Sequence, residues 1–242
     1  MGKVIAIDGP SGAGKSTIAK ELAKQLGFSY LDTGALYRAV ALALREKGIK
    51  PEDSDEKIAS VLKGIDIAFK DGKVFLKENS QLSTLSPQAN PSEAGNSQLP
   101  DGRDVSEEIR TTEIGHYSSV FSARKVVRDF LLDIQRNAAL TNDIVAEGRD
   151  MTTVVFPDAW KKFYLDASLD ERAKRRYLQL KDKGTNITEH EAEKDVAERD
   201  TRDSSRDIAP LRKADDAVHI DSSVMTADKV VANILKIIRS GH

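Results

Sequence analysis

Eight consecutive residues near the start of the chain have the types and spacing of a phosphate-binding loop. They follow the pattern G-x-x-x-x-G-K-[ST], with two glycines, Lys15 and Ser16 at its fixed positions. The apolar run 3–7 before the loop is typical of a buried parallel strand, and residues 17–26 after it have the apolar spacing of a helix. Strand, glycine loop and helix in this order form the context in which the pattern predicts phosphate binding.

The residue types in this loop suit the β- and γ-phosphates of a nucleotide, and the loop alone fits GTPases, ATPases and small-molecule kinases. Glycines let successive backbone N–H groups converge on one concavity, and the helix N-terminus adds a partial positive charge. Lys15 can reach these phosphates, and the Ser16 hydroxyl can ligate the Mg2+ that bridges them. The alternative is a glycine-rich turn that binds nothing, which the Lys and Ser at their required positions disfavour. We expect ATP to contact Gly9, Pro10, Ser11, Gly12, Ala13, Gly14, Lys15, Ser16 and Thr17.

The composition is that of a soluble globular enzyme. The chain has 242 residues, of which 39% are hydrophobic and 31% charged, enough for one main core and an inserted subdomain. A net charge of -2 argues against a nucleic-acid partner. The lack of cysteine excludes disulfides, thiolate zinc sites and a cysteine nucleophile, and it is compatible with a cytoplasmic location. No apolar run approaches the ~18 residues of a membrane span, and a strand begins where a signal peptide would lie.

Short apolar segments alternate with segments of helical periodicity along the chain. The expected strands are residues 3–7, 28–31, 144–146, 162–165 and 217–220, and the expected helices are 17–26, 35–46, 126–139, 168–183 and 227–238. This alternation predicts an α/β fold of three layers with a parallel central sheet. Ligands of such sheets bind beyond the carboxyl ends of the strands, where the polar motifs of this chain also fall.

Two regions interrupt the alternation. Residues 65–69 and 73–76 are separated by Asp71-Gly72, which predicts a hairpin. Residues 78–100 are rich in Ser, Asn, Gln and Pro, and we predict no secondary structure for them. Residues 168–206 are densely charged and are interpreted as a mobile arm.

Arginines stand close to carboxylates in three further segments: 31–38, 147–150 and 198–206. Each has an ordinary explanation, respectively a capped helix with a solvated arginine, a structural ion pair and a solvated charged face. Together with the phosphate loop, the third segment predicts a lid that brings guanidinium groups to a transferring phosphoryl and excludes water. No Asn-Lys-x-Asp segment that would read guanine is present, which argues against a GTPase.

Seven motifs in this order resemble the bacterial cytidylate kinases, which belong to the nucleoside monophosphate kinases. They lie at residues 9–17, 31–38, 104–111, 147–151, 154–159, 165–176 and 199–211, so that the resemblance spans nearly the whole chain. It implies a monomeric enzyme that transfers the γ-phosphate of ATP to CMP or dCMP with Mg2+. It also implies that residues 1–242 form a single P-loop kinase domain. Its parts would be a core (1–38, 116–167 and 207–242), an inserted acceptor region (39–115) and a lid (168–206).

The resemblance also implies roles for individual residues. The expected catalytic residues are Lys15, Arg149, Arg199, Arg172 and Arg176, and Arg175 matches the start of the lid. The expected contacts of CMP are Thr33, Arg38, Ser119, Arg128, Arg149, Asp150, Arg199, Asp203 and Arg206. The chemistry agrees, because a carboxylate such as Asp150 can accept a hydrogen bond from the cytosine amino group, and Arg128 or Arg206 can donate to its O2 and N3. Such a site would reject uracil by leaving buried polar groups unpaired.

Two departures from the family pattern and one carboxylate leave alternatives open. The family usually has Gly where this chain has Thr152, and a β-branched residue tolerates an unusual dihedral poorly. The stretch 78–100 is longer than expected. Asp8 either lies near Mg2+ or has a structural role. A P-loop kinase with another acceptor remains an alternative. A non-catalytic nucleotide-binding module is a third, against which intact Lys15 and Ser16 argue.

Overall fold

The computed structural model describes residues 2–70, 72–78 and 102–240, and these residues form two compact units. The first unit comprises Met1–Gly34 and Gln135–His242, and the second comprises Ala35–Ile134. The second unit therefore begins before, and ends after, the acceptor region 39–115 expected from the sequence. The predicted segment 79–100 and Asp71 of the predicted turn lie outside the described residues.

The first unit is built on a five-stranded sheet with the strand order β2-β6-β1-β7-β8, in which every neighbouring pair is parallel. Its strands are β1 (Val4–Asp8), β2 (Ser29–Asp32), β6 (Ile144–Gly148), β7 (Lys161–Asp166) and β8 (Val218–Asp221). These strands confirm the predicted α/β fold with a parallel central sheet, and each lies within two residues of its predicted bounds. β1 is buried along its whole length, as expected for a strand in the middle of a parallel sheet.

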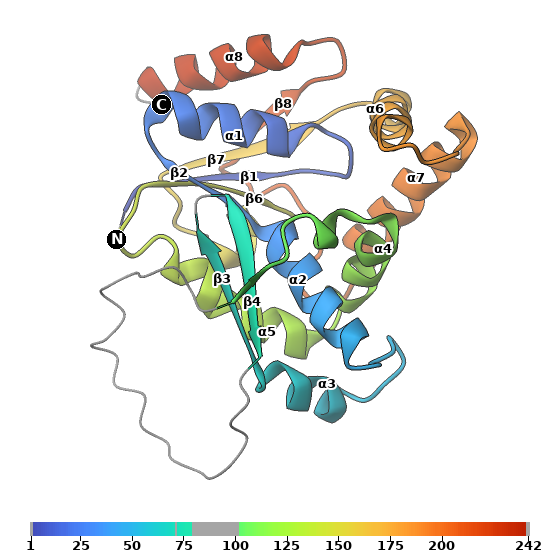
Figure 1. Ribbon diagram of the computed structural model, residues 1–242. Coiled ribbons are helices and arrows are strands. Elements are labelled where there is room, and N and C mark those ends of the chain that lie inside the picture. Colours follow the sequence, from blue (N-terminus) through green and yellow to red (C-terminus); the bar gives the residue numbers. More distant parts are fainter. Residues whose placement is uncertain (1, 71, 79–101, 241–242) are drawn as a thin grey trace. The chain divides into compact units, whose positions relative to one another are not determined.

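Two helices cover one face of this sheet, α1 (Lys15–Leu26) and α8 (Ala227–Arg239) (Figure 1). Ile18 and Leu22 of α1 and Ile234 of α8 pack with Ile7 and Phe163 of the strands in one hydrophobic core. The core therefore holds β1 and α1 rigidly on either side of the glycine loop that joins them. No helix in the described part of the chain is long and apolar enough to cross a membrane.

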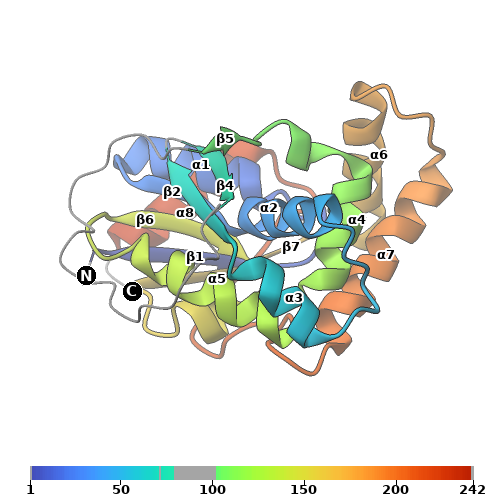
Figure 2. The same cartoon turned by 60° about the horizontal axis from the view of Figure 1, so that its bottom comes forward.

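The charged segment after β7 forms two helices, α6 (Leu169–Asp182) and α7 (Glu189–Ser205), which lie side by side in Figure 2. The sequence predicted the first but not the second. The start of α7 carries a complete capping box, in which Thr188 and Glu191 each bond to the other's backbone N–H. α7 buries few apolar side chains, Ala192 and Val196 among them, so an apolar period was too weak to reveal it.

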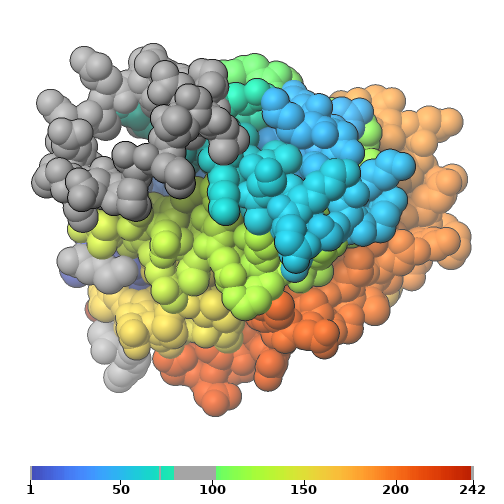
Figure 3. Space-filling view, turned by 90° about the horizontal axis from the view of Figure 1, so that it is seen from below, coloured from blue at the N-terminus to red at the C-terminus, as the bar shows by residue number. Residues whose placement is uncertain are grey.

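The second unit combines helices with a small antiparallel sheet of order β3-β4-β5. Its strands are β3 (Ile65–Lys70), β4 (Lys73–Glu78) and β5 (Arg103–Asp104), and the first two confirm the predicted hairpin. Its helices are α2 (Thr33–Glu46), α3 (Asp55–Leu62), η2 (Glu108–Arg110), α4 (Thr112–Phe121) and α5 (Lys125–Asn137); the first two residues of α2 and the last three of α5 belong to the first unit. In the space-filling view of Figure 3, α3 and its link to α2 form one continuous surface in blue and cyan.

Candidate functional site

At two positions of the loop between β1 and α1, a side chain would collide with the backbone of another segment. Gly9 has a φ of +151°, and a Cβ there would lie 1.9 Å from the carbonyl oxygen of Leu165. Gly12 has a φ of +77°, and its Cβ would lie 2.9 Å from the carbonyl oxygen of Arg172. Both are conformations that L side chains rarely adopt, and both bring backbone against backbone. The two glycines thus let the loop pack closely on the end of β7 and the start of α6.

Lys15 is buried at the first turn of α1, and its Nζ donates to the carbonyl oxygens of Gly9 and Pro10, each at 2.7 Å. Burial, with the nearby charges of Arg149 and Arg199, lowers the pKa of Lys15 to about 7. The opposing charges of Glu147 and Asp203 are too weak to restore its ordinary value of 10.5. Several cations therefore converge beside the loop, and an anion placed among them would be strongly stabilised.

Arg149 follows the end of β6 and pairs with Asp203 of α7. Its Nε donates to the Asp203 carboxylate at 2.7 Å, and its Nη1 donates to the carbonyl oxygen of Gly148 at 3.3 Å. On its other oxygen, Asp203 meets Arg206 at 3.8 Å. Although burial alone would raise it, the charges of Arg149 and Arg199 hold the pKa of Asp203 below its ordinary range. Arg149, which follows β6, thus forms one group with Arg199 and Asp203 of α7 and with Arg206 at its C-cap.

The arginines of α6 divide between two environments. Arg172 donates to the carbonyl oxygens of Ala167 at 2.8 Å and Ser11 at 3.1 Å, and it pairs with Asp200 of α7. The same Asp200 accepts a hydrogen bond from the N–H of Ser11 at 3.0 Å. The hydrogen bonds of Arg172 and Asp200 therefore connect α6 and α7 to the phosphate loop.

The other two arginines of α6 make different contacts. Arg175 donates to the carbonyl oxygens of Ala13 at 3.3 Å and Ser222 at 2.8 Å, so it also touches the loop. Arg176 instead pairs with Asp195 of α7 at 2.8 Å. Of the two arginines predicted to be catalytic on this helix, the structure brings Arg172 to the loop, whereas Arg176 joins α6 to α7.

Asp8 and Thr152 form a contact that the sequence did not predict. The Asp8 carboxylate accepts hydrogen bonds from the N–H of Met151 at 2.9 Å, the N–H of Thr152 at 2.7 Å and the Thr152 hydroxyl at 2.6 Å. Burial raises the pKa of Asp8 to about 6 against the effect of these bonds. Among described non-glycine residues only Ala209 has a positive φ, so Thr152 has a backbone that a β-branched residue adopts. The unusual dihedral considered for this position is absent.

The remaining predicted acceptor residues lie in different parts of the chain. Thr33 donates its hydroxyl to the carbonyl oxygen of Glu147 at 2.6 Å within the first unit, where Asp150 is also buried. The second unit holds the other three, and these are Arg38 on α2, Ser119 on α4 and Arg128 on α5. Within that unit the Arg128 guanidinium lies 5.5 Å from the centroid of the Tyr37 ring and donates to the carbonyl oxygen of Ser122 at 3.0 Å.

The surroundings of Ser16 suit a hard cation. Ser16 is exposed at the start of α1 and hydrogen-bonds to Tyr30, whose hydroxyl donates to Glu147 at 2.7 Å. Burial and the nearby carboxylates of Glu147 and Asp32 raise the pKa of Tyr30. Among the described residues no cluster of three acidic, His or Cys side chains could hold a metal alone. The oxygen donors present fit Mg2+, which keeps several waters and takes further ligands from substrate phosphates.

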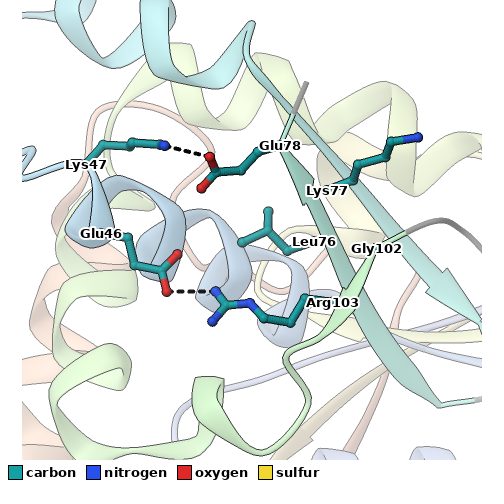
Figure 4. Close-up of a pocket in the computed structure, with 7 residues that line it drawn as sticks. All are labelled: Glu46, Lys47, Leu76, Lys77, Glu78, Gly102 and Arg103. Carbon is teal, nitrogen blue, oxygen red and sulfur yellow. Dashed lines mark hydrogen bonds and ion pairs between the residues drawn. The ribbon is translucent and has the colours of Figure 1, made fainter. Parts of the chain in front are cut away.

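The second unit also contains a cavity of about 540 Å3 (Figure 4). Two ion pairs at its wall join Lys47 to Glu78 and Arg103 to Glu46, each at 2.7 Å. Its lining residues are Glu46, Lys47, Leu76, Lys77, Glu78, Gly102 and Arg103, and none of the predicted site residues is among them.

A glycine loop at the carboxyl end of a parallel strand, with a buried lysine and converging arginines, defines a P-loop phosphotransferase. Comparison with known proteins narrows this class. A family model described as cytidylate kinase matches residues 5–240. The cytidylate kinase of Thermodesulfovibrio yellowstonii is 52% identical over 240 residues, which cover 98% of this chain and 97% of that protein. The cytidylate kinase of Geobacter sulfurreducens is 45% identical over 238 residues, covering 98% and 93%.

The chain therefore belongs to the cytidylate kinase family. It functions as a cytidylate kinase, which is an ATP-dependent phosphotransferase. This confirms the family and the function predicted from the motifs. A solved structure of an uncharacterized protein from Eubacterium ventriosum matches with a TM-score of 0.50 at 15% identity. The match covers 98% of this chain and 99% of that one, and at such low identity it supports the fold alone.

Proposed function

We propose that the enzyme uses CMP and dCMP as acceptors of the ATP γ-phosphate, and that the residues predicted above carry the reaction. The observation that supports this most strongly is the gathering of Lys15, Arg149 and Arg199 beside the glycine loop, where burial and then the charges of the two arginines lower the pKa of Lys15. A transferring phosphoryl group spreads negative charge over its equatorial oxygens, and fixed cations in a water-poor site stabilise that charge.

On this proposal the loop from Gly9 to Thr17 binds the triphosphate through backbone N–H groups. Lys15 exchanges its present carbonyl partners for the β- and γ-phosphates. Arg172 then reaches the transferring group from the base of α6, where it already touches the backbone of Ser11. We assign Arg176 a share in this stabilisation as well, which requires it to leave Asp195 when α6 and α7 close over the nucleotide.

The acceptor would bind through two sets of contacts. Thr33, Arg38, Arg149 and Arg199 would hold its phosphate, and Asp203 its sugar. Asp150, Ser119, Arg128 and Arg206 would read the base, with the Asp150 carboxylate accepting from the cytosine amino group. No general base is needed, because the acceptor is already a phosphate dianion. Bound Mg2+, held by Ser16, would neutralise charge on the bridging phosphates. We also propose that the enzyme is a monomer, which light scattering on the purified chain would test.

The decisive experiment measures ADP release with CMP, dCMP, UMP, AMP, GMP and shikimate, with an acceptor-free control. We expect turnover with CMP and dCMP and little with the others. Asp150→Ala should then lose the preference for cytosine over uracil while remaining folded. Asp158→Ala, which removes an exposed carboxylate of the same unit, should change nothing. Unchanged selectivity in Asp150→Ala would refute the acceptor-site assignment. Turnover with another acceptor would refute the proposal that CMP and dCMP are the substrates.

A further inference from the structure

Asp8 connects the two segments of the first unit that carry the reaction. It ends β1, so its backbone leads directly into Gly9 of the phosphate loop. Its side chain is wholly enclosed, and among the described residues it accepts hydrogen bonds from Met151 and Thr152, which follow Arg149 and Asp150 in the chain. We propose that Asp8 and the Thr152 hydroxyl act together as positioning residues for Arg149 and Asp150. This inference rests on the proposed roles of those two residues.

The segment that donates these hydrogen bonds needs an acceptor outside itself. Residues 151–155 form a single π-helical turn, η3 (Met151–Val155), whose first N–H groups have no partner within the turn. Asp150 stands at its N-cap, yet its side chain makes no capping hydrogen bond. Asp8 supplies the acceptor instead, with one oxygen for Met151 and the other for Thr152. Asp8, and not Asp150, therefore caps the first N–H groups of this turn.

The Thr152 hydroxyl adds a third bond to this anchor. It donates at 2.6 Å to the oxygen that also accepts the Thr152 N–H. Bonds to an ionised acceptor are roughly twice as strong as neutral ones, and this one lies in a fully buried site. A glycine at this position could not make the bond, because it has no hydroxyl. In this chain the Thr152 side chain therefore helps to fix both the position and the orientation of the turn.

A second contact holds the same turn from the other side. A Cβ on Gly148 would come within 2.9 Å of both the Met151 side chain and the Thr33 hydroxyl. The Met151 side chain thus packs closely against the end of β6, while the Asp8 carboxylate fixes its backbone. Arg149 lies between these two fixed points and pairs with Asp203 at 2.7 Å. A shift of about 1 Å in a group that orients substrate can cost about a hundredfold in rate, so this anchoring bears directly on turnover.

The test compares four substitutions in the full-length enzyme. Thr152→Val keeps the shape and removes the donor, Thr152→Ser keeps the donor, and Thr152→Gly removes the side chain. Thr153→Val is the matched control, since Thr153 is the exposed neighbour in the same turn. We expect Thr152→Val and Thr152→Gly to lower kcat/KM for CMP about tenfold, the effect of one lost bond to a charged group. The KM for ATP should change less than twofold.

The conservative variant separates positioning from stability. Thr152→Ser should restore kcat/KM for CMP to within about twofold of the parent, and Thr153→Val should equal the parent. Equal CMP kinetics in Thr152→Val and the parent, or no rescue by Thr152→Ser, would overturn the inference even if melting temperatures differ. Failure of the parent enzyme to phosphorylate CMP would instead overturn the proposed function. Asp8→Asn places an amide N–H against a backbone N–H. When folded, this variant should have a lower kcat/KM for CMP than Thr152→Val.

Discussion

ATP binding should draw about one proton from solution at pH 8, and Lys15 should be the group that takes it up. In the structure, burial and the charge of Arg149 lower the pKa of Lys15 to about 7. A polyphosphate beside the ammonium group would return its pKa toward the ordinary value of 10.5. The bound state therefore holds a proton that the unbound state has largely lost above pH 7.

The size of the effect follows from the two pKa values. At pH 8 a group of pKa about 7 is about 10% protonated, and a group near its ordinary pKa is fully protonated, so uptake is about 0.9 proton per nucleotide. At pH 6 the unbound lysine is already about 90% charged, and uptake falls to about 0.1. By linkage, the affinity for ATP should fall about tenfold for each pH unit above 7.

Calorimetric titration of the enzyme with ATP in buffers of different ionisation enthalpy measures this uptake directly. The slope of the observed enthalpy against buffer ionisation enthalpy is the number of protons taken up. The phosphates contribute little at pH 8, because phosphate groups titrate near pH 6. Lys15→Arg is the informative control, since a guanidinium stays charged throughout and should bind ATP without proton uptake. Lys24→Met removes an exposed lysine of the same helix and should behave as the parent.

A slope near zero for the parent at pH 8 would refute the reasoning, because Lys15 would then be charged before ATP arrives. Equal slopes for the parent and Lys15→Arg would show that another group takes up the proton. Either result would remove the main observation that supports the phosphate site.

Three further predictions concern stability. Gly9→Ala should prevent folding or lower the free energy of unfolding by several kcal/mol, because its Cβ would overlap the Leu165 carbonyl. Gly27 also has a positive φ, but nothing lies within 4 Å of its Cβ position, so Gly27→Ala should cost about 1 kcal/mol. Chemical denaturation measures both values. Asp203→Ala should cost about 3 kcal/mol by leaving the Arg149 charge buried without this partner, and a double-mutant cycle with Arg149→Ala should recover much of that loss. The raised pKa of Asp8 means that the native state holds a proton which the unfolded state releases first. Unfolding free energy relative to Asp8→Asn should therefore fall by about 3 kcal/mol in total as the pH rises from about 3 to 7, and it should stay level above pH 7. A difference that does not change with pH would contradict this prediction.

The strands of the first unit, and its helices α1, α6 and α8, could be predicted because their signals are local, whereas α7 could not. An apolar run such as 144–146, or a stripe of apolar residues at helical spacing such as 227–238, can be recognised within one segment. β6 and α8 lie where these two patterns predicted a strand and a helix. The glycine loop is likewise a local signal, since its spacing alone specifies a strand-to-helix turn. α3 and α4 were not predicted. They are 8 and 10 residues long, so each offers few turns in which a period can be recognised.

The candidate site was predictable as a set of residues but not as an arrangement. Arg172 and Arg176 stand four positions apart on one helix and looked equivalent in the sequence. Only the packing of α7 on α6 decides that Arg172 contacts the phosphate loop and that Arg176 pairs with Asp195. Their different environments depend on which face of the helix meets which neighbour, and no local pattern records that.

By itself, the sequence determined the chemistry of this protein: a phosphate loop with Lys15, arginines in separate segments and motifs shared with a whole family. The tertiary structure alone decided how that chemistry is held. Asp8 and Thr152 are 144 positions apart, yet they share a hydrogen bond because β1 and β6 are neighbours in the sheet. The pKa of Lys15 likewise depends on charges that folding brings near it. Residue types are encoded position by position, whereas burial and long-range contacts exist only once the chain has folded.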